Sequence, residues 1–129
     1  MDIESFSEDL KGRYLACRSL GKLNYVLAYL FLILATVSSA AAALSIALGY
    51  LSPAGNAALA GLPGILYVAN RLFRFEEKSK WWYEKFYVIE GLYRELVREG
   101  QNEKTVSEEL TVQSRELAKR WPGFGEAPY

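Results

Sequence analysis

The stretch LNYVLAYLFLILATVSSAAAALSIALGYLSPAGNAALAGLPGILYVAN, from Leu23 to Asn70, contains no charged residue. All 15 Lys and Arg and all 15 Asp and Glu of the 129-residue chain lie outside it. A soluble domain mixes charged and apolar residues at the period of its helices or strands, whereas this chain separates them into blocks. The stretch is also far longer than the apolar core of a signal peptide, about 7–15 residues, so we expect it to stay in the mature protein. The sequence therefore predicts a membrane protein.

The uncharged stretch is long enough for two membrane crossings and a turn. A transmembrane helix needs about 20 apolar residues to cross about 30 Å of hydrocarbon. Residues 51–56 favour a turn, because Pro53 lacks a backbone N–H and because Gly55 and Asn56 tolerate turn conformations. We therefore predict a two-helix transmembrane hairpin over residues 23–73, with crossings at 23–50 and 57–73.

The second crossing is the shorter one, and its first half contains Gly61, Pro63 and Gly64. A re-entrant or interfacial segment is therefore an alternative for residues 57–73. The charges favour a full crossing, since positive residues flank both outer ends of the hairpin and the turn carries none. By the positive-inside rule both termini then face the cytoplasm. We expect a multi-pass protein of the inner (plasma) membrane, in contact with the lipid bilayer.

Amphipathic cytoplasmic helices are predicted before and after the hairpin, which makes the predicted fold all-α. In residues 1–22, Phe6, Leu10, Tyr14 and Cys17 recur at helical spacing, and this helix can run directly into the first crossing.

Two further helices are predicted after the membrane, at residues 74–99 and 106–121, followed by a C-terminal tail at 122–129. Gly100 is suited to end the first of them, and Thr105 with Glu108 forms a capping box for the second.

The helix at 74–99 carries an apolar seam with the alternating three- and four-residue steps of a coiled coil. A seam this short does not stabilise an isolated helix, so it needs a partner. Two partners are open: the other cytoplasmic helices of the same chain, or a second molecule in a homo-oligomer or complex. The seam consists of Phe75, Trp82, Phe86, Ile89, Tyr93 and Leu96.

The first crossing carries a stripe of small or hydroxylated residues, again in steps of three and four: Ala35, Ser38, Ala42, Ser45, Gly49 and Ser52. Such stripes let helices approach closely without lipid between them. Alternatively, the serine hydroxyls, together with Thr36 or Ser39, line a water-filled path in an oligomer. In the second crossing we expect a matching packing edge, made of Ala57, Gly61 and Gly64.

The composition excludes several classes of function. The chain has no His and only Cys17, so zinc clusters and His-based catalysis within one chain are excluded, and we expect no catalytic residue, no metal and no cofactor. The formal net charge of +0 argues against a nucleic-acid partner. A coupled transporter is also disfavoured, because the membrane segments lack any charged residue. The sequence therefore does not predict an enzyme.

The layout resembles the SLATT-domain family, which consists of two-transmembrane proteins associated with bacterial nucleotide-signalling defence systems. The resemblance covers about residues 13–100 and lies in the basic first helix, the compact hairpin, the exit FRFEEK at 73–78 and the stretch EGLYREL at 90–96. It implies an effector that oligomerises into a membrane pore and harms the host cell in antiviral defence. It also implies a nucleotide-signalling or sensor protein as a partner, and it supplies no catalytic residue.

Two functional hypotheses follow. The first is a homo-oligomeric pore-forming or membrane-disrupting effector, in which the stripe of the first crossing faces a shared axis. The second is a non-conducting scaffold or accessory subunit that anchors a partner through its cytoplasmic helices.

Overall fold

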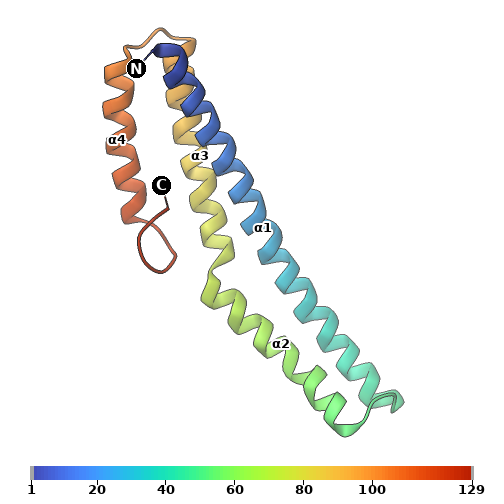
Figure 1. Ribbon diagram of the computed structural model, residues 1–129. Helices are drawn as coiled ribbons and strands as arrows, with labels where there is room; N and C mark the ends of the chain where they lie inside the picture. The colour runs from blue at the N-terminus through green and yellow to red at the C-terminus, as the bar shows by residue number, and fades with distance from the viewer. Residues whose placement is uncertain (1, 129) are drawn as a thin grey trace. The chain divides into compact units, whose positions relative to one another are not determined.

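The computed structural model describes residues 2–128, which form four α-helices and no strand (Figure 1). The helices are α1 (Ile3–Leu48), α2 (Pro53–Phe73), α3 (Phe75–Val97) and α4 (Glu103–Lys119). The prediction of an all-α fold is confirmed. The chain divides into two compact units. Unit 1 contains the residues up to Asn24 and those from Glu76 onward, and unit 2 contains residues 25–75.

Helix α1 belongs to both units, because the predicted helix at 1–22 continues without a break into the predicted crossing at 23–50. No proline interrupts this stretch, and a glycine inside a helix costs only about 1 kcal/mol relative to alanine. The helix ends at Leu48, two residues before the predicted end. Gly49 adopts the left-handed conformation with φ +69°, and its N–H donates to the carbonyl of Ser45 at 2.9 Å.

Helix α2 begins at Pro53, four residues earlier than predicted. The hydroxyl of Ser52 caps the helix by accepting from the N–H of Gly55 at 3.1 Å, and a proline is favoured in the first helical turn. Most of the predicted turn at 51–56 is therefore the first turn of α2. At its other end, Arg74 adopts the left-handed conformation (φ 53°) and donates its N–H to the carbonyl of Asn70.

Helices α3 and α4 differ from the predicted 74–99 and 106–121 at their ends. Gly100 follows α3 with φ +68°, as expected of a residue that ends a helix. The predicted capping box at the start of α4 is wrong, because Thr105 lies inside the helix. Asn102 is the cap instead: its side chain accepts from the N–H of Lys104 at 2.8 Å. Asn is at least as good an N-cap as Thr, and here it comes earlier in the chain.

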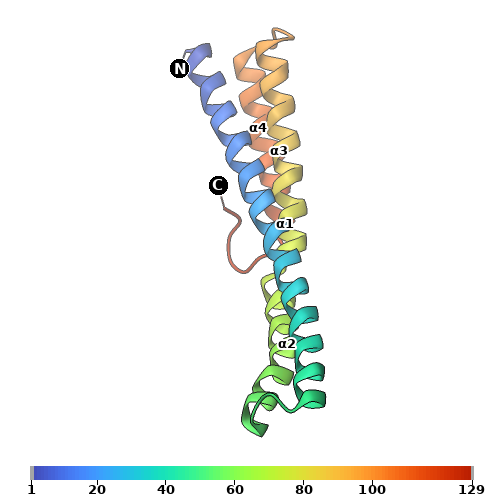
Figure 2. The same cartoon turned by 90° about the vertical axis from the view of Figure 1, so that its right-hand side faces the viewer.

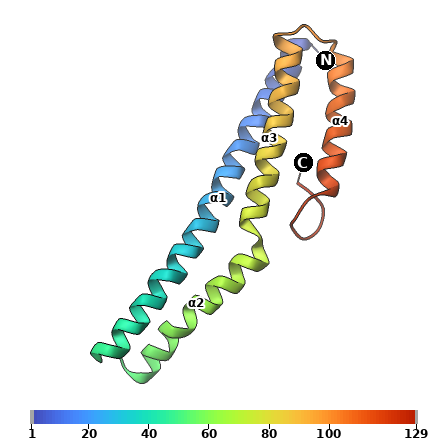
Figure 3. The same cartoon turned by 180° about the vertical axis from the view of Figure 1, so that it is seen from behind.

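In unit 1, the first part of α1, α3 and α4 lie side by side, and α3 runs antiparallel to both of the others (Figures 2 and 3). The Ser79 hydroxyl donates to the Gly21 carbonyl at 2.8 Å, which joins α3 to α1. The indole N–H of Trp81 donates to the Leu117 carbonyl at 2.8 Å, which joins α3 to α4. The buried core of this unit consists of Phe6, Leu10, Cys17, Trp81, Trp82, Ile89, Leu92, Leu96, Val106 and Leu117.

In unit 2, the second part of α1 pairs with α2. The start of α3 also belongs to this unit, because the Phe75 ring lies 5.3 Å from the Phe31 ring on α1. Of the helices in the described part of the chain, α1 alone is both long enough and apolar enough to span a membrane. Helix α2 has the length, but its prolines, glycines and asparagines dilute its apolar character.

Candidate functional site

The surface of unit 2 is the most unusual feature of the molecule. Its stretch 23–70 has no charge, yet most of its large apolar side chains are exposed, and no residue of α2 is buried. Soluble monomers rarely expose contiguous apolar surface beyond a few hundred Å². Such a surface needs lipid or further protein to cover it. The exposed residues on α1 include Val26, Leu30, Leu32, Ile33, Leu34, Val37, Leu44, Ile46 and Leu48, and those on α2 include Leu62, Ile65, Tyr67, Val68, Leu72 and Phe73.

The predicted stripe of the first crossing forms the interior of unit 2. Ser38, Ala42 and Ser45 are buried and Ala35 is half-buried, while Gly49 and Ser52 at the turn are exposed. The Ser45 hydroxyl donates to Oδ1 of Asn56 on α2 at 2.8 Å. The Ser38 hydroxyl donates to the carbonyl of Ala35 in its own helix at 3.1 Å. In a single chain the stripe is thus a helix-packing surface.

The small-residue edge predicted on α2 does not face α1 within the single chain. Ala57, Gly61 and Gly64 are exposed, and a Cβ atom added to either glycine would meet nothing within 4 Å. The half-buried face of α2 repeats instead in steps of three and four through Asn56, Leu59, Pro63, Leu66 and Asn70. The bond between Ser45 and Asn56 is consistent with this rotation of the helix, because it places Asn56 against α1.

The predicted partner seam of α3 is largely covered by the chain's own helices. Trp82, Ile89 and Leu96 are buried in the core of unit 1, and Phe86 and Tyr93 are half-buried beside it. The ring of Tyr14 on α1 lies 5.8 Å from Phe86 and 5.5 Å from Tyr93. Of the two partners left open by the sequence, the structure places the same chain's helices on this seam.

Phe75, the first residue of the predicted seam, lies apart from the others. Its ring packs between Phe31 and Phe73 in unit 2. The left-handed residue Arg74 separates α3 from α2 directly before it, so the seam proper starts one heptad later, at Trp82.

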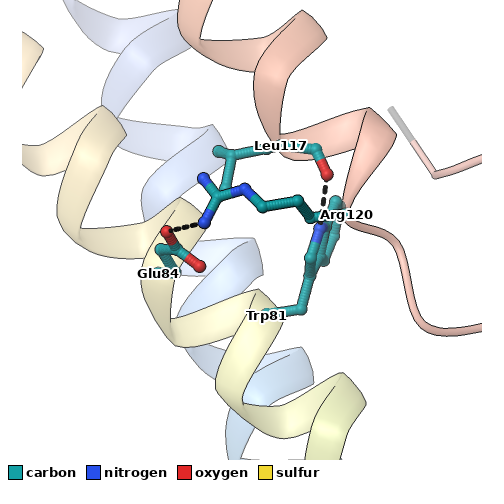
Figure 4. A network of polar contacts seen from close by, with 4 residues as sticks. All are labelled: Trp81, Glu84, Leu117 and Arg120. Carbon is teal, nitrogen blue, oxygen red and sulfur yellow. Dashed lines mark hydrogen bonds and ion pairs between the residues drawn. The ribbon is translucent and has the colours of Figure 1, made fainter.

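The sequence analysis missed a cluster of three indole rings in unit 1. Trp81 lies edge-on to Trp121 at 4.6 Å and to Trp82 at 4.9 Å. Beside this cluster, Arg120 at the end of α4 pairs with Glu84 on α3 at 2.6 Å, and Figure 4 shows this ion pair next to the bond from Trp81 to the Leu117 carbonyl. The sequence did not indicate that Trp121 packs against Trp81 and Trp82, because the two segments are far apart in the chain.

Lys85 is the buried cation of this cluster. Its ammonium nitrogen lies 5.2 Å from the ring centre of Trp81 and 5.6 Å from that of Trp82, and it donates to the carbonyl of Pro128 at 3.2 Å. Burial lowers the pKa of Lys85 below its usual 10.5, and burial raises the pKa of the Cys17 thiol above its usual 9.0. A buried thiol of raised pKa is a poor nucleophile, so these two groups do not form a reactive pair.

Within residues 2–128, no group of three or more His, Cys, Asp or Glu side chains is arranged to hold a metal ion. A comparison with protein-family models gives no match, and searches of the curated proteins and of the solved structures give none either.

Proposed function

We propose that the chain is an integral membrane protein in which unit 2 forms a two-span hairpin in the inner membrane, with both termini in the cytoplasm. The uncharged stretch 23–70 and the exposed apolar surface of unit 2 support this arrangement. The lengths fit, since the 21 residues of α2 extend about 31 Å at 1.5 Å per residue, close to the hydrocarbon thickness.

Within the membrane, the function best supported is that of a non-conducting anchor. The observation that carries it is the position of the stripe on α1: Ser38 and Ser45 are buried within the single chain, and the Ser45 hydroxyl is bonded to Asn56 on α2. A pore lined by this stripe would require the hairpin to open and that bond to break. As an anchor, the chain holds unit 1 at the cytoplasmic surface. The partner we propose there is the sensor or nucleotide-signalling protein that the family resemblance implies.

Leakage from liposomes tests this function. The purified full-length chain is reconstituted into dye-filled vesicles, and its mass in detergent is measured on the same sample. We expect no dye release from vesicles that contain the wild-type protein or the variant Ser45→Ala. Dye release by the wild-type chain that Ser45→Leu abolishes, with helicity unchanged, would contradict the anchor and would support a pore lined by the stripe.

A homo-oligomeric pore is the second candidate, and a different surface favours it. Thr36 and Ser39 are exposed hydroxyl-bearing residues on α1, and the small residues Ala57, Gly61 and Gly64 leave one face of α2 open. Small residues let helices of neighbouring copies approach closely. An oligomer built in this way fits the membrane-disrupting defence effector that the resemblance implies. Its signature is leakage that Thr36→Leu or Ser39→Leu reduces and Ser45→Ala does not.

A further inference from the structure

Among residues 2–128, Phe124 is the most exposed of the large hydrophobic side chains, with 90% of its surface accessible. It lies in the loop that follows α4, between Gly123 and Gly125, and Gly125 has φ +76°. Figures 1 and 3 show that this loop lies beyond the end of α4, at the end of unit 1 where α3 begins. A single exposed apolar residue is common on soluble proteins, so exposure of Phe124 alone does not indicate a partner.

The loop is held on both sides of Phe124. Before it, Trp121 packs edge-on against Trp81, and Gly123 lies so close to Trp121 that a Cβ atom on it would be 2.7 Å from the indole ring. After it, the carbonyl of Pro128 accepts a hydrogen bond from the buried Lys85. Both ends of the loop are therefore packed against unit 1, whereas the side chain of Phe124 at the tip of the loop is not covered by other residues of the chain.

The base of the loop contacts Lys78, a residue of α3 that lies close, along the chain, to the end of α2. The Lys78 ammonium lies 5.8 Å from the ring centre of Trp121, and Lys78 follows Arg74 by four residues, about one helical turn of 5.4 Å. Three residues of extended chain from Trp121 to Phe124 add a reach of about 10 Å. The headgroup regions add about 5–8 Å to each side of the hydrocarbon, so Phe124 is within reach of the leaflet from which α2 emerges.

We propose that the loop at residues 122–125 is a third membrane contact, in which Phe124 enters the headgroup layer of that leaflet. The proposal rests on the membrane insertion of unit 2 proposed above. The surroundings suit an interface: an aromatic ring at the tip, indole rings at the base and the Lys78 ammonium beside them for lipid phosphates. Glu126, two residues further on, is exposed.

Lipid-borne quenchers test the contact in the full-length protein. In a chain that carries Cys17→Ala, single cysteines at Phe124→Cys, Val112→Cys and Ile33→Cys are labelled with an environment-sensitive fluorophore. The chains are reconstituted into vesicles of phosphatidylcholine and phosphatidylglycerol that carry nitroxides in the headgroup or in the acyl chain. We expect headgroup nitroxides to quench position 124 several-fold more than the exposed position 112 on α4, and acyl-chain nitroxides to quench position 33.

The outcomes separate this proposal from the one on which it rests. Quenching at position 33 without quenching at 124 overturns the loop contact and leaves the membrane insertion intact. Absence of quenching at position 33 overturns both.

A label can itself enter the membrane, so a second measurement places the label at Glu126→Cys and compares chains that retain Phe124 with chains that carry Phe124→Asp. The contact predicts a several-fold loss of headgroup quenching with Phe124→Asp, and equal quenching in the two chains contradicts it.

Discussion

At the scale of single residues, the hydrogen bond from the Ser45 hydroxyl to Asn56 links the side chains of α1 and α2 in unit 2. Hydrogen bonds between helices in a membrane contribute about 0.6 kcal/mol on average. We expect Ser45→Ala to lower the free energy of unfolding in lipid by about this amount, and Ser45→Leu to lower it more, because the site is too small for a larger side chain. Ser39→Ala, at an exposed hydroxyl of the same helix, is the matched control and should have no effect.

Lys85 and Cys17 make the free energy of unfolding depend on pH in opposite directions. The pKa of Lys85 is lowered on folding, so between that value and 10.5 the unfolded chain binds more protons and stability rises with pH. The pKa of Cys17 is raised on folding, so its contribution is complete below 9.0 and is lost as the pH rises further. Arg13 lowers both pKa values through its charge, and the two groups also interact with each other.

Substitution of each residue separates the two effects. Measured relative to the wild type, the stability of Lys85→Met should fall as the pH rises toward 10.5, and that of Cys17→Ala should rise above pH 9.0. Denaturant unfolding in detergent micelles from neutral pH to pH 10.5 checks both slopes. Parallel pH profiles for the wild type and both variants would contradict the burial of these groups in the folded protein.

At the scale of elements, the sequence predicts the existence of the helices better than their ends or their orientation. The apolar stretches and the repeat of Phe6, Leu10 and Cys17 are local patterns, and these three residues are buried. Helix ends depend on which of several suitable residues caps first, as Ser52 and Asn102 do here. Capping candidates close together in the sequence differ too little in free energy for the pattern to rank them.

The cap of α4 gives a direct test. Asn102→Ala removes the side chain that accepts from the N–H of Lys104, and we expect it to destabilise unit 1 by about 1 kcal/mol. Thr105→Ala, at the cap that the sequence favoured, should have an effect within about 0.5 kcal/mol, the range of exposed surface substitutions. Thermal unfolding followed by circular dichroism measures both. A larger loss with Thr105→Ala than with Asn102→Ala would restore the capping box.

The faces of helices are harder to predict where both sides of a helix are apolar or small. On α2, Gly61 and Gly64 and the face through Leu59 and Leu66 repeat with equally good helical spacing, and α1 packs against the second set. On α3, the sequence predicts the seam through Trp82 and Ile89 but does not identify its partner. The residues that cover the seam come from α1 and α4, which are far away in the sequence. A local sequence pattern carries no information about how distant segments pack together.

At the scale of the whole molecule, the segregation of charge in the sequence corresponds to the division into two units. Unit 1 has a conventional core in which Leu10, Val106 and Leu117 are at most 1% exposed, and it carries all the charged residues before Leu23 and from Glu76 onward. Unit 2 buries only small side chains of α1 and presents its large ones outward. This contrast between an inward-packed unit and an outward-facing unit is the physical reason for our proposal that unit 2 lies in lipid.

The proposed topology makes a prediction about sidedness. If both helices of unit 2 cross the bilayer, the turn after α1 faces the side opposite to the turn after α3. In a chain that carries Cys17→Ala, single cysteines at Tyr50→Cys and Gln101→Cys, both at exposed positions, are treated with a membrane-impermeant thiol reagent in intact spheroplasts and in inverted vesicles. We expect position 50 to react only in spheroplasts and position 101 only in inverted vesicles. Reaction of both positions from the same side would show that α2 does not cross, and would favour the re-entrant or interfacial alternative for this segment, whose prolines and glycines weaken its apolar character.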